Sequence, residues 1–209
     1  MFTGIIEAIG TLSDITTEGT NTHYYFSSPL TAELKVDQSL AHDGVCLTVV
    51  KVTSEGYQVT AIAETLQKTN LSAWKVGKKV NLERCMSANG RFDGHIVQGH
   101  VDGIAKVVVN EMGEKWQKFV VEIPVHLKKY VVNQGSICID GVSLTVGSID
   151  DATSAVTLWL IPETLEKTTL GENAVGESVN IEVDVLAKYV ERLLSQRADD
   201  GKLSGGGHE

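Results

Sequence analysis

The 209-residue chain is poor in cysteine, and its three cysteines form neither a Cys-x-x-Cys pair nor a cluster with histidine at zinc-binding spacing. An odd number of cysteines in a chain of this length does not indicate a disulfide framework, because such a chain can bury a core without covalent links. We therefore expect three reduced thiols and no metal site.

Long apolar runs are missing as well, since no segment approaches the roughly 20 residues of a membrane-spanning helix. Residues 1–4 lack the basic flank and apolar core that begin a signal peptide. Acidic residues outnumber basic ones by 27 to 18, which gives a net charge of −9. Nucleic acids and anionic membranes are bound by clustered lysine and arginine. The sequence thus predicts a cytoplasmic protein that binds neither of them, and a small ligand without strong negative charge.

The sequence also lacks the dinucleotide loop Gly-x-Gly-x-x-Gly, the Walker loop, the nucleophile elbow Gly-x-Ser-x-Gly and the zinc motif His-Glu-x-x-His. It has no long crossover helices, which an α/β sheet would require. These absences argue against an α/β nucleotide-binding or hydrolase fold.

What the sequence does contain is an internal repeat. Residues 43–49, Asp-Gly-Val-Cys-Leu-Thr-Val, return at 140–146 as Asp-Gly-Val-Ser-Leu-Thr-Val, so that Ser143 takes the place of Cys46. Three further stretches return in the same order, 4–9 at 99–104, 64–71 at 163–170 and 76–83 at 175–182. Four matches in register predict two similar units of about 95 residues each.

Short strands and glycine-containing turns fill both units. In the first unit we expect strands within 1–13, 22–26, 45–50, 58–62 and 79–83, a hairpin turn at Asp43–Gly44 and a short helical turn at 64–71. Strands at this spacing predict an antiparallel barrel or sandwich in each unit.

One long helical pattern follows both units. Leu186, Val190, Leu193 and Leu194 recur at helical spacing and form a single apolar stripe. The stripe must be buried either across the barrels or against copies of the helix in other subunits. The polar, glycine-rich residues 199–209 are predicted to be disordered.

Cys46 is the first candidate for chemistry. Residues 45, 47 and 49 place their apolar side chains on one face of the predicted strand, and Cys46 and Thr48 share the other face. Ser143 and Thr145 repeat this polar face in the second unit. A buried, inert cysteine and a ligand-facing cysteine are equally good interpretations from the residues alone.

Two histidines and two further cysteines complete the reactive side chains considered. His95 and His100 flank Gly99 at a spacing that puts them on opposite faces of a strand, so a shared metal is not expected. A structural role remains the alternative for either histidine. Cys85 and Cys138 lie in strand patterns and are interpreted as core residues.

The two helical turns open with Glu64-Thr65 and Glu163-Thr164, where free amide groups could bind carbonyl oxygens of a ligand. Plain helix capping is the alternative. The residues alone therefore predict a tandem β-fold that binds a small molecule at a polar, hydroxyl-lined surface.

Several stretches together resemble the riboflavin synthase family over most of the chain: 1–6 (Met-Phe-Thr-Gly-Ile-Ile), 43–49, 94–103 (Gly-His-Ile-Val-Gln-Gly-His-Val-Asp-Gly), 139–146 and 161–171. The resemblance implies two similar six-stranded antiparallel Greek-key barrels in tandem, followed by a C-terminal helix that builds a homotrimer. It also implies a cofactor-free dismutation. Two molecules of 6,7-dimethyl-8-ribityllumazine react, and transfer of a four-carbon unit gives riboflavin and 5-amino-6-(D-ribitylamino)uracil.

The resemblance divides the chain into an N-terminal lumazine-binding barrel (1–89), a C-terminal lumazine-binding barrel (90–185), a trimerisation helix (186–198) and the tail. In this family, the N-terminal barrel of one subunit faces the C-terminal barrel of its neighbour. Association with lumazine synthase is a further partner interaction that the resemblance suggests.

The residues that the resemblance implies fall into three sets. The N-barrel site comprises Gly4, Ile5, Ile6, Cys46, Leu47, Thr48, Thr60, Ala61, Ile62, Ala63, Glu64 and Thr65. The C-barrel site comprises Gly99, His100, Val101, Gln134, Ser143, Leu144, Thr145, Ile161, Pro162, Glu163, Thr164, Leu165 and Glu166. Candidates for activating water or moving protons are Ser39, Cys46, His95, His100 and Asp184, with Phe2 shaping the N-terminal site.

The chain departs from the family pattern at Gln134, where relatives can carry lysine, and at Asp93, where glycine is usual. The competing function is that of a non-catalytic lumazine- or flavin-binding fluorescent protein of the same fold. Such relatives lose the polar residues that this chain keeps at Ser39, Cys46 and Thr48, so the enzyme is favoured. A flavin reductase would need an Arg-x-Tyr-Ser motif and a nucleotide domain, which the sequence lacks.

Overall fold

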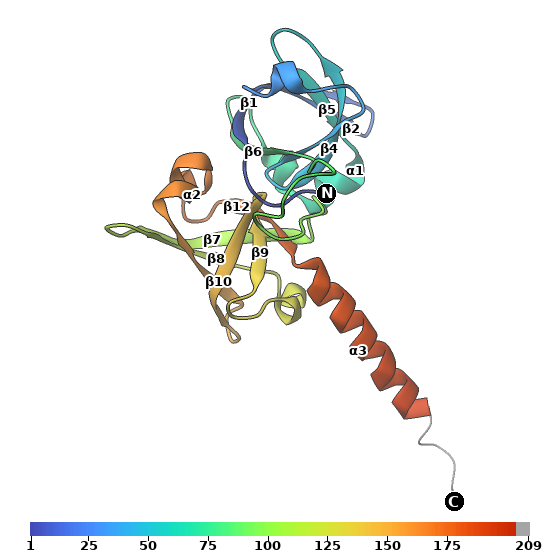
Figure 1. The fold of residues 1–209 in the computed structure, drawn as a ribbon, viewed down its shortest axis with the longest axis vertical. Helices are drawn as coiled ribbons and strands as arrows, with labels where there is room; N and C mark the ends of the chain where they lie inside the picture. Colours follow the sequence, from blue (N-terminus) through green and yellow to red (C-terminus); the bar gives the residue numbers. More distant parts are fainter. Residues whose placement is uncertain (204–209) are drawn as a thin grey trace, which may run out of the picture.

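The first half of the chain closes into a barrel of six antiparallel strands (Figure 1). The computed structural model describes residues 1–203, with side chains up to residue 196. Around the barrel the order is β1-β2-β5-β4-β3-β6, and β6 pairs with β1. The strands are β1 (Ala8–Glu18), β2 (Asn21–Ser27), β3 (Ser39–His42), β4 (Val45–Val52), β5 (Tyr57–Ala61) and β6 (Lys79–Arg84).

The second half forms a closed barrel with the same cyclic order when each strand is matched to its repeat partner. In each barrel three consecutive strands are followed around the wall by an earlier strand, as in a Greek key. The predicted all-β fold of two tandem six-stranded barrels is therefore confirmed. The strands are β7 (Gly103–Met112), β8 (Gln117–Glu122), β9 (Ser136–Ile139), β10 (Val142–Asp150), β11 (Ala155–Leu160) and β12 (Ser178–Val183).

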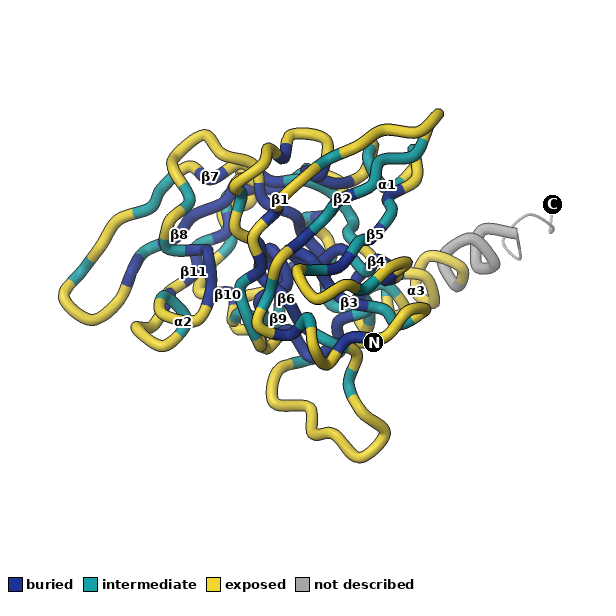
Figure 2. Tube along the Cα trace, turned by 90° about the horizontal axis from the view of Figure 1, so that it is seen from above, coloured by how far each residue is buried: buried dark blue, intermediate teal, exposed yellow. Residues whose placement is uncertain are grey.

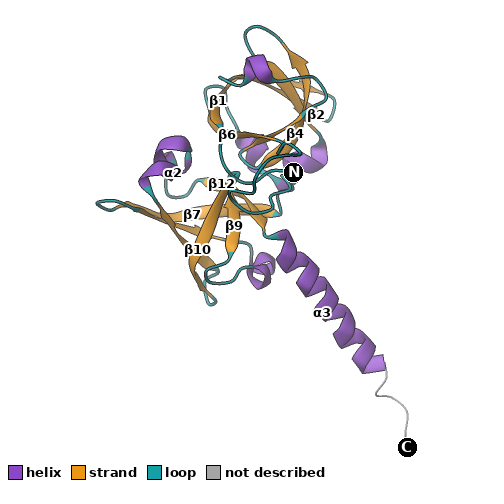
Figure 3. Cartoon of the chain, viewed as in Figure 1, coloured by secondary structure: helices purple, strands orange, loops and turns teal. Residues whose placement is uncertain are grey.

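Short helical segments lie at equivalent places of the two barrels (Figure 3). Helix α1 (Ala63–Lys68) follows β5, and α2 (Pro162–Lys167) follows β11. The 3₁₀ turns are η1 (Thr31–Glu33), η2 (Asn70–Ala73), η3 (Val125–Tyr130) and η4 (Leu170–Glu172).

Each barrel has a hydrophobic core of its own, made by alternate residues of its strands. On β4 the predicted faces are confirmed, because Val45, Leu47 and Val49 are buried whereas Thr48 is exposed. Each large aliphatic side chain buried in this way contributes roughly 1.5–3 kcal/mol to stability. Figure 2 shows the buried segments gathered inside the barrels and where the barrels meet.

The chain start differs from the prediction of a strand within residues 1–13, because β1 begins only at Ala8. Residues before it leave the barrel wall and pair with the segment that connects the two barrels. Phe2 donates to the carbonyl of Val97 at 2.7 Å and accepts from its amide at 3.1 Å. These partners lie 95 positions apart, so the two equivalent ends of the repeat bond to each other.

Helix α3 (Val185–Leu203) leaves the C-terminal barrel and points away from both barrels (Figure 1). It is longer than the predicted helix of 186–198 and takes in the first residues of the predicted tail. Residues 204–209 of the predicted tail lie outside the described residues.

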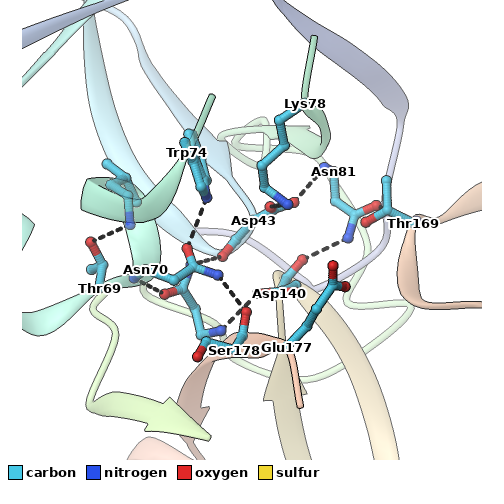
Figure 4. A network of polar contacts seen from close by, with 12 residues as sticks. Asp43, Thr69, Asn70, Trp74, Lys78, Asn81, Asp140, Thr169, Glu177 and Ser178 are labelled. Carbon is cyan, nitrogen blue, oxygen red and sulfur yellow. Dashed lines mark hydrogen bonds and ion pairs between the residues drawn. The ribbon is translucent and has the colours of Figure 1, made fainter. Parts of the chain in front are cut away.

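The two barrels are joined by reciprocal hydrogen bonds of side-chain amides, which form part of the polar network in Figure 4. Asn81 on β6 donates to the carbonyl of Asp140 at 2.9 Å and accepts from the amide of Thr169 at 2.8 Å. Its repeat partner Asn180 donates to the carbonyl of Asp43 at 2.9 Å and accepts from the amide of Asn70 at 2.8 Å. The predicted hairpin turn at Asp43 is confirmed and forms part of this interface.

Two buried carboxyl groups and one ammonium group lie in this interface. Burial raises the pKa of the Asp43 carboxyl to about 6, although Lys78 at 3.4 Å opposes the shift. Burial and the nearby Asp43 raise the pKa of the Asp140 carboxyl well above its usual range. The ammonium group of Lys78 thus faces two carboxyl groups and can balance only one negative charge. We therefore assign Asp43 as the charged group and Asp140 as the group that stays protonated at neutral pH.

The interface predicts a pH-dependent stability. A carboxyl group whose folded pKa is raised stabilises the fold fully below its unfolded pKa, and that contribution is lost as pH rises through the folded value. For Asp43 the loss falls between about pH 4 and pH 6 and amounts to about 3 kcal/mol. Urea unfolding from pH 4 to 7 should show this decline in the wild type and a smaller one in Asp43→Asn. The exposed Asp93→Asn serves as control, and equal slopes in the wild type and Asp43→Asn would contradict the assignment.

Candidate functional site

Two equivalent segments cross between the barrels, and we call residues 1–6 the N-strap and residues 96–101 the C-strap. The amide of Ser143 on β10 donates to the carbonyl of Gly4 at 2.8 Å, and the amide of Cys46 on β4 donates to the carbonyl of Gly99 at 3.0 Å. Each strap therefore lies on a strand of the barrel formed by the other half of the chain, and this is the strand that was predicted to face the ligand.

This exchange corrects the predicted composition of the two sites. Ile6 packs in the core of the C-terminal barrel, and Val101 packs against the core of the N-terminal barrel. Residues 4–6 thus belong beside Ser143, and residues 99–101 belong beside Cys46, the reverse of the prediction. The lack of a side chain at Gly4 permits the N-strap to lie this close to β10, since a Cβ on Gly4 would lie only 2.6 Å from the Cβ of Ser143.

The C-terminal barrel carries a pocket of about 250 Å³ between the N-strap, β10 and α2. Its lining residues are Gly4, Ile5, Ile6, Val142, Ser143, Ile161, Glu163, Thr164, Lys167 and Thr168. Seven of them are predicted site residues, although the prediction placed three of these, Gly4, Ile5 and Ile6, on the other barrel.

The repeat places equivalent groups on the N-terminal barrel, beside the C-strap. Three differences distinguish the sites, because Cys46 stands for Ser143, His100 stands for Ile5 and Val101 stands for Ile6. The remaining equivalents of the pocket lining are Val45, Ile62, Glu64, Thr65, Lys68, Thr69 and Gly99. The two surfaces therefore share one framework but differ in the groups that can exchange protons.

Cys46 is half-buried on the outer face of β4. Burial raises the pKa of its thiol, and the Ser39 hydroxyl opposes the shift. The thiol is therefore protonated at neutral pH and can donate a hydrogen bond. Cys138 is buried as predicted, but Cys85 is exposed, because it follows the last residue of β6, where the chain leaves the barrel.

His95 lies against the second site. Its Nδ1 is 2.7 Å from the Ser143 hydroxyl oxygen. Burial lowers the pKa of His95, and the nearby Asp184 carboxylate opposes the shift, so the imidazole is neutral at neutral pH. The structure thus brings together three residues that lie far apart in the sequence. Residues 95–100 pair only through a bridge at Val97, so the strand geometry considered for His95 and His100 does not apply to them.

The first turns of α1 and α2 carry no side-chain cap. Glu64 instead pairs with Lys68 at 2.7 Å, and Glu163 pairs with Lys167 at 2.7 Å. Such exposed pairs contribute little to stability. The capping alternative for these glutamates is therefore wrong, and both lysines join the site framework, which the sequence prediction missed.

Other predicted residues lie at the edge of the sites or beneath them. Phe2 is fully buried between the barrels with Val97 and Cys138, and Cys46 packs against this group. Ala61 is also fully buried, so a ligand could contact only its backbone. Gln134 is exposed in the turn before β9, where its φ of 64° is left-handed.

Asp93 is exposed and lies 3.7 Å from Arg91 on the linker between the barrels. Within residues 1–203 no group of three or more His, Cys, Asp or Glu side chains could hold a metal ion. No helix in that part of the chain is long and apolar enough to cross a membrane.

Comparisons with known proteins agree with the tandem-barrel fold. The model of the Lumazine binding domain matches residues 3–85 and 98–184. Riboflavin synthase of Photobacterium phosphoreum is 42% identical over 206 residues, which cover 98% of this chain and 94% of that protein. Riboflavin synthase of Mycobacterium tuberculosis is 43% identical over 197 residues, which cover 93% and 98%. A crystal structure of LumP complexed with riboflavin has a TM-score of 0.81 at 24% identity, over 88% of this chain and 99% of that chain, and this likeness concerns the fold.

The close approach at Gly99 predicts a specific sensitivity. A Cβ there would lie 2.6 Å from that of Cys46, and φ is +77°. Gly19 also has a positive φ, +61°, but open space around it. Left-handed backbone costs both alanine variants roughly 1–2 kcal/mol, and overpacking adds about 1–3 kcal/mol for Gly99→Ala. Chemical unfolding should show a larger loss of unfolding free energy in Gly99→Ala than in Gly19→Ala. Equal losses in the two variants would contradict the packing of the C-strap on β4.

Proposed function

This chain belongs to the riboflavin synthase family, and we propose that each of its barrels holds one 6,7-dimethyl-8-ribityllumazine for dismutation to riboflavin. The second product is 5-amino-6-(D-ribitylamino)uracil. The observation that carries the proposal is the presence of two equivalent surfaces, each made of a strap, a polar strand and a short helix, for a reaction that consumes two identical molecules. The proposed barrel boundaries remain 1–89 and 90–185.

The two surfaces suit the two roles that this reaction needs. One lumazine loses a proton from its C7 methyl group, and the other is activated at C7 for attack. Neutral His95, beside Ser143, can accept a proton in the C-terminal barrel. The protonated thiol of Cys46 can donate a hydrogen bond in the N-terminal barrel. Holding both substrates in a fixed orientation supplies much of the acceleration in such a reaction.

The proposed site residues are those of the three sets above, with the straps exchanged between the barrels. Thr48, Thr65, Thr145 and Thr164 offer hydroxyl groups, and Ser39, His100 and Asp184 complete the polar set. A lumazine-binding protein without turnover is the alternative, and the polar set on the Cys46 side argues against it.

We also propose that the chain is a homotrimer assembled through α3. Leu186, Val190, Leu193 and Leu194 are each more than half exposed on this helix. An apolar stripe of this length on a helix that projects from the barrels suits burial against other copies. Assembly would place the N-terminal barrel of one subunit against the C-terminal barrel of the next. Cytoplasmic localisation and association with lumazine synthase remain proposals that rest on the family.

The proposed activity is tested by mixing the purified chain with 6,7-dimethyl-8-ribityllumazine and following the appearance of riboflavin fluorescence. Two substrate molecules should disappear for each riboflavin formed. Tight binding of lumazine without riboflavin formation would favour the alternative.

Cys46→Ser should lower turnover about 10-fold and Cys46→Ala about 100-fold, because the hydroxyl keeps a donor but changes its acidity. Ligand affinity and melting temperature of Cys46→Ser should stay close to those of the wild type. The control is Cys85→Ser, at an exposed thiol. Normal turnover combined with a lower melting temperature in Cys46→Ser would identify Cys46 as a structural residue.

Val190→Glu/Leu194→Glu should give monomers with little activity, because two charges cannot be buried in an apolar helix interface. Sedimentation velocity measures the assembly state, and Gln196→Glu on the same helix is the control. An intact trimer in the double variant would place the assembly surface on the barrels.

A further inference from the structure

Helix α3 is tied to the C-terminal barrel next to the C-strap. The ammonium of Lys188 lies 2.6 Å from Oδ1 of Asp102, the residue that follows the strap. The other carboxylate oxygen of Asp102 accepts from the amide of Val183 on β12 at 2.9 Å. Both side chains of the ion pair are largely shielded from water, with exposures of 29% and 19%.

The C-strap itself is held by a second carboxylate. Glu182 is buried and accepts from the amides of Gln98 at 2.6 Å, Gly99 at 2.9 Å and His100 at 2.9 Å. Burial raises the pKa of Glu182, whereas these amides and the nearby Lys188 oppose the shift. Lys188 therefore favours the charged state of Glu182 and forms an ion pair with Asp102 at the base of the strap.

In the first barrel an equivalent carboxylate holds the N-strap, but the cation beside it does not come from a helix. Glu83 accepts from the amides of Thr3 and Gly4 in the N-strap, as Glu182 does in the C-strap. Glu7 occupies the place of Asp102, and its cation is Arg84, at 2.6 Å, the last residue of β6. The repeat partner of Arg84 is an apolar residue, Val183, so the second barrel takes its cation from α3 instead.

We propose that Lys188 is a positioning residue for the N-barrel site, which acts through Asp102 and Glu182 on the strap that carries Gly99 and His100 beside Cys46. The inference rests on the proposed function. The same helix, α3, carries the apolar stripe that is proposed for assembly. The position of α3 on the barrel therefore affects both the assembly and the order of the N-barrel site.

The test uses the full-length protein with Lys188→Met, Lys188→Arg and Glu191→Gln. Methionine keeps the apolar stem but removes the charge, and arginine restores it. Glu191 provides the matched control, because it lies about one turn further along α3 and its 2.5 Å ion pair with Lys129 does not involve the strap. Deuterium exchange at the amides of 98–100 is measured first, without ligand. Riboflavin is then titrated by fluorescence quenching.

Lys188→Met should raise exchange at 98–100 at least 10-fold and weaken one riboflavin site about 10-fold, with the sedimentation coefficient unchanged. Lys188→Arg should restore both properties, and Glu191→Gln should alter neither. Unchanged exchange at 98–100, or an equal rise throughout the barrels, would overturn the inference. A wild type that binds no riboflavin would refute the proposed function, while the exchange data would still decide whether Lys188 anchors the strap.

Discussion

Asn81 and Asn180 each satisfy two backbone groups of the opposite barrel with one side-chain amide. These four groups belong to segments that the interface buries, and a buried polar group without a partner costs about 1–3 kcal/mol. The pairing is reciprocal, so neither barrel can slide or rotate without breaking bonds on both sides. This constraint fixes the relative position of the barrels, and with it the path of the two straps between them.

The exchange of straps follows from that fixed position. The N-strap reaches Ser143 and the C-strap reaches Cys46, so each candidate site is built from both halves of the chain. A duplicated barrel therefore does not contain a complete site by itself. Sequence similarity between the halves marks the shared framework, whereas the differences at Cys46 and His100 lie at side chains that can exchange protons.

The same scaffold holds charges that are not symmetric. Lys78 faces the interface from the first repeat, but its repeat partner is Glu177, so two buried carboxyl groups share one cation. At the strap anchors, the first barrel carries Arg84, and the second relies on Lys188 of α3. The two halves thus share the same backbone fold but differ in where a few cationic side chains lie.

The repeat, the all-β class, the inward face of β4 and the existence of α3 could be predicted from the sequence, because they follow from periodicity and self-similarity. The strap exchange, the contact of His95 with Ser143 and the exposure of Cys85 could not. These features depend on which surfaces meet across the barrel interface, and residues 95 and 143 carry no local pattern that joins them. Local periodicity determines elements, but contacts between distant segments are decided only when the whole fold satisfies its buried polar groups.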